Sequence, residues 1–251
     1  MTDGFRVWRA ARATGEVASE CPYGRCDGSG FVIDEETNTA YDCRCRPQII
    51  ARRRARSLSA VIPRIYQGIA FDRFPVTEIE PRATVTATRR FADRVGEMLD
   101  AGRGLWFMGE VGTGKTTLAM LVTKAALDAG RTAARYTLPI LLGQIRRTFD
   151  TGSHADLFEQ LVAVDLLHID DIGAEQTTPW VLEELYSIVN ARYEERRSMV
   201  ITTNILDRET LCQQITERTV SRLTEMCDEL KVMGPDHRMD AGIDWSAISR
   251  A

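Results

Sequence analysis

The chain has 251 residues, of which 44% are hydrophobic and 27% charged, and its formal net charge is −4 at pH 7. This composition is that of an ordinary globular domain with room for a small appendage. It excludes a membrane-spanning segment, because no apolar run is long enough, and the first 20 residues lack an apolar signal core, so we expect a cytoplasmic protein.

Residues 1–20 show no clear pattern and are expected to form a flexible leader. Four of the six cysteines follow as two close pairs, Cys21 with Cys26 and Cys43 with Cys45. In a reducing compartment cysteines serve as thiols or metal ligands instead of disulfides. Two close pairs on a glycine-rich ribbon suit tetrahedral Zn²⁺ in a segment too small to form a core. Unligated thiols and an iron–sulfur cluster are the alternatives.

Seven arginines and no acidic residue lie between Arg44 and Arg64. This stretch is predicted to be helical, and its charge suits DNA phosphates or an acidic partner surface. A solvated helix face is an equally simple interpretation. Prolines at 63 and 75 bracket a connector. We therefore expect a leader at 1–20, a cysteine-rich zinc module with a basic helix at 21–60, a linker at 61–75 and a nucleotide-binding domain at 76–251.

Helix and strand patterns alternate through that last domain. Helices are expected at 83–101, from 117 onward, and at 138–149, 155–162, 181–195 and 217–223. Strands are expected at 105–108, 132–137, 165–170, 198–203 and 230–233. The alternation predicts an α/β fold in which helices cover both faces of a parallel sheet.

A phosphate-binding loop follows the first of these strands. Its residues fit the pattern G-x-x-x-x-G-K-[ST] and are Gly109, Glu110, Val111, Gly112, Thr113, Gly114, Lys115, Thr116 and Thr117. Strand, loop and helix occur in the order that such a loop requires, because backbone N–H groups and a helix N-terminus then face a triphosphate. Lys115 would reach the β- and γ-phosphates of ATP, and Thr116 would ligate Mg²⁺.

Two carboxylates end the strand predicted at 165–170. Ligands in open α/β sheets bind at the carboxyl ends of strands, so Asp170 is expected to face the Mg²⁺ ion held by Thr116. Asp171 is the candidate for polarising the attacking water, and Glu175 is the alternative. A surface turn after the strand would also explain an Asp-Asp-x-Gly sequence. His168 is expected to be packed within the strand.

Two further polar positions complete the candidate site. Asn204 ends the strand predicted at 198–203 and could orient the attacking water without adding charge. Arg218 and Arg222 lie four residues apart on a short helix, where either could act on a neighbouring subunit's phosphates. A solvated helix face explains that pair equally well.

In this order the motifs resemble those of the AAA+ ATPases, and most closely the DnaC/DnaI helicase loaders and their IstB-type transposition relatives. The similar stretches are the phosphate loop and residues 62–64, 70–74, 165–175, 180–186, 190–196, 201–204, 217–223 and 234–238. The resemblance implies a P-loop NTPase fold of the AAA+ type, with Asn204 as sensor 1 and Arg222 as the arginine finger. Arg218 is the fallback for the finger.

This chain departs from the AAA+ pattern at two points. Many AAA+ proteins have Asp-Glu where this chain has Asp170 and Asp171, which implies slow hydrolysis. Only 29 residues follow Arg222, too few for the usual C-terminal helical lid, so we expect the lid to be absent.

The resemblance implies an ATP-hydrolysing helicase loader of DNA replication, with ATP, Mg²⁺ and Zn²⁺ as cofactors. Such a protein would self-associate through its ATP sites, hold single-stranded DNA and act on a DnaB-like replicative helicase. The zinc module would dock on that helicase, as in DnaI-like loaders. An IstB-like transposase-helper ATPase is one alternative. An ATP-dependent binding module with negligible hydrolysis is the other.

Overall fold

The computed structural model describes residues 21–34, 37, 39–47, 49–50, 62–173 and 178–237. The chain divides into two compact units between Ser57 and Leu58, and each unit is described by itself. Several expectations fall outside the described residues: the leader at 1–20, much of the basic helix, and the side chains of Glu175 and Arg238. The segment boundaries expected at residues 60 and 75 stay predictions.

The small unit is built on a β-hairpin that the sequence pattern did not predict. Strands β1 (Phe31–Asp34) and β2 (Thr39–Asp42) pair in antiparallel register, with Phe31 opposite Asp42. The chain enters and leaves this hairpin through the two cysteine pairs. The N–H of Cys43 donates to the carbonyl of Gly30 at 2.8 Å, which closes the open end of the hairpin.

The large unit contains a five-stranded sheet in which every pairing is parallel, as predicted. Its strands are β3 (Gly104–Met108), β4 (Ala133–Thr137), β5 (Leu166–Asp170), β6 (Ser198–Thr203) and β7 (Cys227–Lys231). They lie in the order β4-β5-β6-β3-β7, so β3 is next to the last two strands of the chain. Strands β3, β5 and β6 are completely buried, which explains their continuous apolar sequences.

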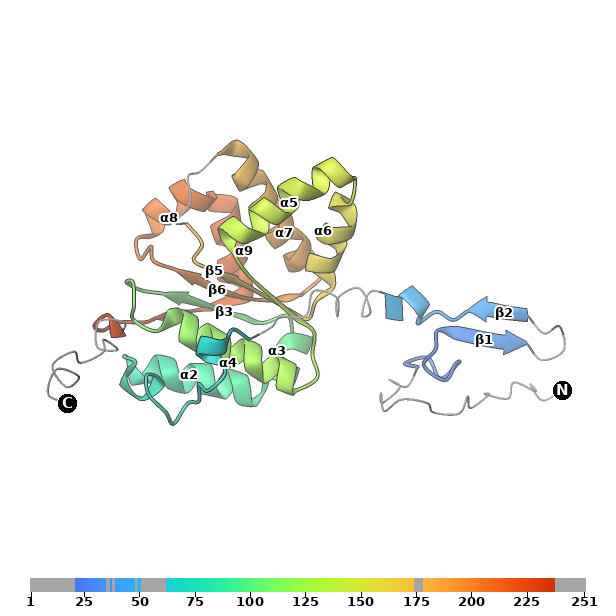
Figure 1. Cartoon of the computed structure of the whole chain (residues 1–251), viewed down its shortest axis with the longest axis horizontal. Helices are drawn as coiled ribbons and strands as arrows, with labels where there is room; N and C mark the ends of the chain where they lie inside the picture. Colours follow the sequence, from blue (N-terminus) through green and yellow to red (C-terminus); the bar gives the residue numbers. More distant parts are fainter. Residues whose placement is uncertain are drawn as a thin grey trace, which may run out of the picture. The chain divides into compact units, whose positions relative to one another are not determined.

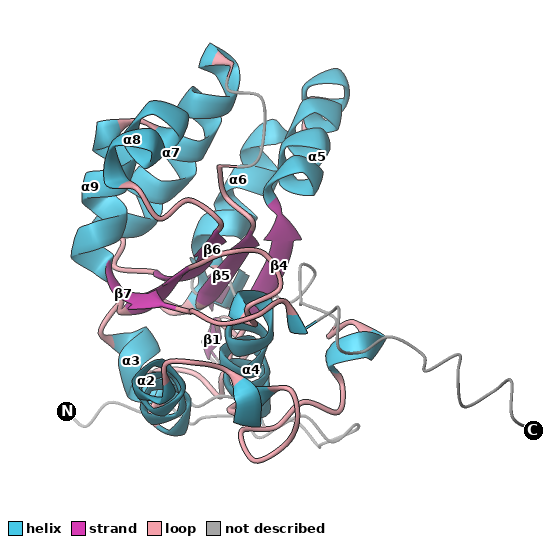
Figure 2. Ribbon diagram, turned by 90° about the vertical axis from the view of Figure 1, so that its left-hand side faces the viewer, coloured by secondary structure: helices cyan, strands magenta, loops and turns pink. Residues whose placement is uncertain are grey.

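Helices cover both faces of this sheet (Figures 1 and 2). One face carries α2 (Arg82–Asp93), α3 (Val95–Asp100) and α4 (Lys115–Asp128). The other carries α5 (Leu138–Thr151), α6 (His154–Ala163), α7 (Pro179–Glu194), α8 (Arg208–Ile215) and α9 (Glu217–Met226). Two 3₁₀ turns, η1 (Arg64–Tyr66) and η2 (Val76–Glu78), precede the first of these helices.

Two expected elements differ from the structure. The helix predicted at 83–101 is interrupted at Arg94, which has φ −116° and ψ 25° and so leaves the helical conformation. Buried side chains continue at helical spacing across this break, which is why the pattern did not reveal it. Strand β7 begins three residues before the predicted start at 230. The prediction missed these residues because Asp228 and Glu229 are exposed on this edge strand and interrupt its apolar pattern.

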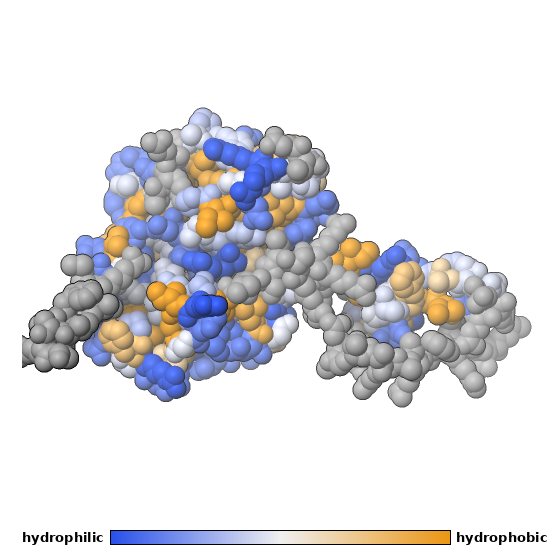
Figure 3. Space-filling view, viewed as in Figure 1, coloured by the Kyte–Doolittle hydropathy of each residue, from blue (hydrophilic) through white to orange (hydrophobic). Residues whose placement is uncertain are grey.

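The surface of the described chain is mixed in character. In the view of Figure 3, hydrophilic and hydrophobic side chains alternate over both units. Among the described residues, no helix combines the length and the apolarity that crossing a lipid bilayer requires. After β7 the described chain runs only to His237, so the expected absence of a helical lid stays a prediction.

Candidate functional site

The predicted phosphate loop connects the buried end of β3 to the start of α4. Gly112 and Gly114 have φ values of 77° and 101°, in the left-handed region that favours glycine. A Cβ atom on Gly114 would lie 2.4 Å from Cδ1 of Ile79, so this position also lacks space for a side chain. The loop therefore turns tightly and brings its backbone to the N-terminus of α4, as anion binding requires.

Lys115 is the first residue of α4, and its side chain folds back onto the loop. Its Nζ donates to the carbonyl of Glu110 at 2.5 Å, and the hydroxyl of Thr113 donates to the same carbonyl at 2.9 Å. Lys115 is only 6% exposed, although ammonium groups are rarely buried. An ammonium held within the turn of the loop is suited to an anionic ligand at that point.

Asp170, at the end of β5, lies against the first turn of α4. Its Oδ1 accepts hydrogen bonds from the hydroxyl of Thr116 at 3.0 Å and from that of Thr202 at 2.7 Å. Its Oδ2 accepts from Nη2 of Arg135 at 2.8 Å. The structure thus brings together the two residues predicted to bind Mg²⁺, and a carboxylate beside a hydroxyl is a donor set that suits this ion.

The surroundings of Asp170 favour its charged form. Burial acts to raise the pKa of this carboxyl, but His168, Thr202 and Arg135 outweigh burial and hold the pKa well below its ordinary value. His168 Nε2 is 3.8 Å from Oδ1, beyond hydrogen-bonding distance, so the two hydroxyls and the guanidinium fix the carboxylate. His168 itself is fully buried, which lowers its pKa, and its Nδ1 lies 3.0 Å from the Thr123 hydroxyl. The histidine is therefore packed beneath α4, as expected.

Asp171 and Asn204 contact each other at the same edge of the sheet. The amide Nδ2 of Asn204 donates to Oδ1 of Asp171 at 2.5 Å. Asp171 has φ 63°, an unusual value for a residue other than glycine, and its N–H donates to the hydroxyl of Thr202 at 2.8 Å. Strand β6 lies between β3 and β5, so Asn204 follows the strand that separates the phosphate loop from the two acids.

The two candidate arginine fingers lie on α9, whose end leads into the amino end of β7. The guanidinium of Arg222 packs over the Tyr193 ring at 4.1 Å from its centroid, whereas Arg218 is exposed. Helix α9 ends just before the amino end of β7, while the phosphate loop follows the carboxyl end of β3. A pocket of about 380 Å³, lined in part by Tyr193 and Glu225, lies beside Arg222. Arg222 therefore lies toward the end of the sheet opposite to the phosphate loop.

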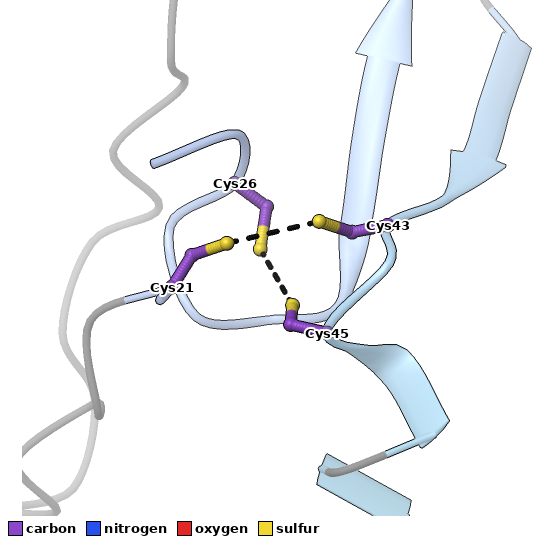
Figure 4. Close-up of side chains that lie close together, drawn as sticks. All are labelled: Cys21, Cys26, Cys43 and Cys45. Atoms are coloured by element: carbon purple, nitrogen blue, oxygen red, sulfur yellow. Dashed lines mark hydrogen bonds between the residues drawn. The ribbon is translucent and has the colours of Figure 1, made fainter. Parts of the chain in front are cut away.

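The four cysteines of the small unit form a compact cluster (Figure 4). Their sulfur atoms all lie within 4.8 Å of one another, with Cys21 and Cys43 at 3.7 Å and Cys26 and Cys45 at 3.4 Å. A tetrahedral Zn²⁺ site with Zn–S bonds near 2.3 Å places sulfurs about 3.8 Å apart. Desolvation opposes ionisation of Cys21, but the backbone amides of Arg25, Cys26 and Tyr23 outweigh it and lower its pKa to about 6. The spacing of the four sulfurs therefore fits a zinc ion.

Two residues of the site were not predicted from the sequence. Thr202 was assigned only to a strand, because a threonine in a β-branched run is unremarkable. Arg135 offered a signal, since it is a charged residue within a short strand whose first two residues are buried alanines. Such a position requires a partner for the charge, and the structure shows that this partner is Asp170.

Fold and site together define a P-loop nucleotide-binding protein of the AAA+ type. A phosphate loop follows one buried parallel strand, an acidic pair follows another, and an asparagine follows the strand between them. Residues 87–241 match the model of a family described as "IstB-like ATP binding protein". That match covers more than half of the chain, and the chain belongs to this family.

Comparisons with individual proteins agree with the family. The replicative helicase loader DnaC of Buchnera aphidicola (subspecies Acyrthosiphon pisum) is 26% identical over 183 residues, covering 70% of this chain and 73% of its own. The replicative helicase loader DnaI of Bacillus subtilis is 22% identical over 163 residues, covering 64% and 51%. A crystal structure of the DnaC helicase loader superposes with a TM-score of 0.56 at 27% identity, covering 61% and 89%. The predicted resemblance to helicase loaders and IstB-like ATPases is thus confirmed.

Proposed function

We propose that this chain is an ATP-hydrolysing helicase loader that acts in DNA replication. The observation that carries the proposal is the hydrogen bond from Thr116 to Asp170 beside the phosphate loop. A hydroxyl beside a carboxylate at the phosphate loop supports a site for the Mg²⁺ of a bound ATP. The similarity to DnaC and DnaI supports the loader role.

Each residue of the site has a role in this proposal. The phosphate loop and Lys115 bind the triphosphate, and Thr116 and Asp170 hold the magnesium ion, which neutralises charge on the phosphates. Asp171 and Asn204 orient the attacking water. Oδ1 of Asp171 already accepts a hydrogen bond from Asn204, so it is less available to take a proton from the attacking water. We therefore expect slow turnover. Arg222 of a neighbouring copy completes the site.

The cysteine module supports a loader over a transposase helper. The family match to IstB-like proteins keeps the helper as a second candidate function. The cysteine cluster lies outside the residues that this family model matches, so it requires a separate purpose. We propose that it binds zinc and forms the docking module for a DnaB-like ring helicase. Single-stranded DNA would be held by the assembled ATPase units.

Nucleotide binding is tested by replacing Lys115 with alanine in the full chain. The variant is expected to lose affinity for a fluorescent ATP analogue by at least about tenfold, because the ammonium partner of the phosphates is gone. Lys124→Ala is the matched control, since Lys124 pairs with Asp128 on the exposed side of the same helix. Equal binding by wild type and Lys115→Ala would refute an ATP site at this loop.

The loader role is tested by affinity capture with the zinc-loaded full chain. A hexameric replicative helicase is expected to bind in an ATP-dependent manner, and single-stranded DNA is expected to stimulate turnover. Cys43→Ser is the control that damages the small unit and leaves the ATP site intact. Capture of a transposase in place of the helicase would favour the helper function. Nucleotide binding without measurable turnover would favour a binding module.

A further inference from the structure

Arg135 stands out because it is a cation placed next to the candidate magnesium site by an edge strand. It lies in β4, directly opposite His168 of β5 in the parallel register. From there its guanidinium reaches two residues along β5 to the carboxylate of Asp170, where Nη2 and Oδ2 are 2.8 Å apart. The side chain of Arg135 is 20% exposed and that of Asp170 only 8%. Water is therefore accessible to the arginine, yet its guanidinium contacts the buried acid.

The two oxygens of Asp170 are held by different kinds of donor. Oδ1 accepts from two neutral hydroxyls, which leave the negative charge of the carboxylate in place. Oδ2 accepts from a guanidinium, which compensates that charge. Among the described residues, no other arginine or lysine hydrogen-bonds to Asp170. His168 Nε2 lies 3.8 Å from Oδ1, beyond hydrogen-bonding distance, so Arg135 is the permanently charged group in contact with this buried acid when no divalent cation is bound.

We propose that Arg135 is a positioning residue that acts as the internal counter-ion of Asp170 and thereby weakens the affinity of the ATP site for Mg²⁺. The inference rests on the proposed ATP-binding function. Two effects act in the same direction. A fixed positive charge next to the carboxylate repels a divalent cation, and a compensated carboxylate gains less from binding one. The ion pair between Arg135 and Asp170 therefore stabilises the metal-free protein relative to the metal-bound protein.

The test is the Mg²⁺ requirement of nucleotide binding, measured with a non-hydrolysable fluorescent ATP analogue while free Mg²⁺ is varied. Arg135→Gln removes the charge and keeps a polar side chain of similar reach. This variant should reach half-maximal binding at a free Mg²⁺ concentration lower than wild type by roughly tenfold or more. Metal is to be removed by dialysis and not by chelation, because a chelator would also extract zinc from the cysteine cluster. Wild-type or higher Mg²⁺ demand in Arg135→Gln would overturn the proposal.

Two controls separate charge from general damage. Arg135→Lys keeps the charge and is expected to stay within about threefold of the wild-type Mg²⁺ requirement. If Arg135→Lys lowered the Mg²⁺ requirement by roughly tenfold, the proposal would also be overturned, because the charge is kept in that variant. This comparison holds even if Arg135→Gln fails to fold. Arg131, four residues before Arg135, forms a comparable ion pair with Asp100 at 2.7 Å. Arg131→Gln breaks this pair and should leave the Mg²⁺ requirement unchanged. An equal fall in Arg131→Gln would refute the assignment to Arg135.

The same titration distinguishes this inference from the proposed function. Wild-type protein that binds no nucleotide at any Mg²⁺ concentration would refute the ATP site and the inference together. Wild-type protein that binds nucleotide, combined with an unchanged requirement in Arg135→Gln, would refute only the role of Arg135. The readout is an equilibrium affinity, so it does not depend on hydrolysis.

Discussion

At the scale of single residues, Arg192 on α7 is the most heavily bonded side chain of the large unit outside the site. It has no exposed surface, and its pKa falls to about 9 because of burial and the nearby charge of Arg197. Its two terminal nitrogens donate to five backbone carbonyls: those of residues 161, 162, 164, 165 and 198. These carbonyls end α6 and begin β5 and β6. One guanidinium thus ties a helix end to the amino ends of two central strands.

Arg192→Met should destabilise the protein by about 3–5 kcal/mol, because three buried and two part-buried carbonyls would lose their donor. Urea unfolding followed by circular dichroism measures this change in the free energy of unfolding. Arg94→Met is the control: Arg94 makes an exposed ion pair with Glu97 at 2.6 Å, and its loss should cost less than about 1 kcal/mol. Equal losses in the two variants would contradict the bridging role of Arg192.

Residue patterns predicted the ATP site only in part. The phosphate loop and Asp170 could be found because their chemistry requires a fixed spacing and a strand end. Arg135, Thr202 and Arg192 contact their partners across strands or helices far away in the sequence, and a single sequence does not show which strands are neighbours. The partner of Asp170 could be identified only once β4 was seen beside β5.

At the scale of elements, the cysteine hairpin and the ATPase helices differ in what stabilises them. Around the cysteines the packing consists of the sulfurs themselves with Val32 and Ile49, which is too little apolar surface for an independent core. A bound metal would supply the missing free energy. The hairpin was missed because β2 is exposed throughout and β1 has three apolar residues in succession, so neither sequence alternates between apolar and polar residues.

Zinc binding predicts a specific order of thiol reactivity towards an aromatic disulfide reagent. In metal-loaded protein, Cys212 should react first, because it is partly exposed and lies outside the cluster. Cys227 should react slowly, because burial raises its pKa to about 12 and suppresses the thiolate. Removal of zinc with a chelator should expose four further thiols. Identical reaction rates of the cluster before and after chelation would argue against a metal site.

At the scale of the whole molecule, the candidate ATP site and the candidate finger Arg222 lie at opposite ends of the sheet. The phosphate loop follows the carboxyl end of β3, whereas Arg222 lies on the helix that leads into the amino end of β7. In a head-to-tail assembly, the amino ends of one copy's strands would face the carboxyl ends of the next copy's strands. The expected interaction is therefore between subunits, in agreement with the sequence-based expectation that Arg222 acts on a neighbouring copy.

Mixing two inactive variants tests this arrangement. Lys115→Ala lacks a working ATP site and keeps its finger, while Arg222→Ala keeps its ATP site and lacks the finger. In an equal mixture about a quarter of the contacts should pair an intact site with an intact finger, and ATPase turnover should partly return. Replacing Arg222→Ala with Arg218→Ala in the mixture is the control. If Arg222 is the finger, Arg218→Ala should turn over ATP by itself, and its mixture should not exceed the sum of the two variants measured separately. An inactive Arg218→Ala that recovers on mixing would assign the finger to Arg218, and no recovery in either mixture would contradict action between subunits.

The strand order has a consequence for how the protein is made. Strand β3, which bears the phosphate loop, pairs only with β6 and β7, whose residues are translated long after it. A nascent chain that has emerged as far as β5 therefore holds the phosphate loop and the acidic pair on strands that have no direct contact. Contacts between segments so distant in sequence form late and slowly. Until β6 inserts between them, the half-made domain exposes two apolar strands, and at this stage of synthesis we expect it to depend most on chaperones.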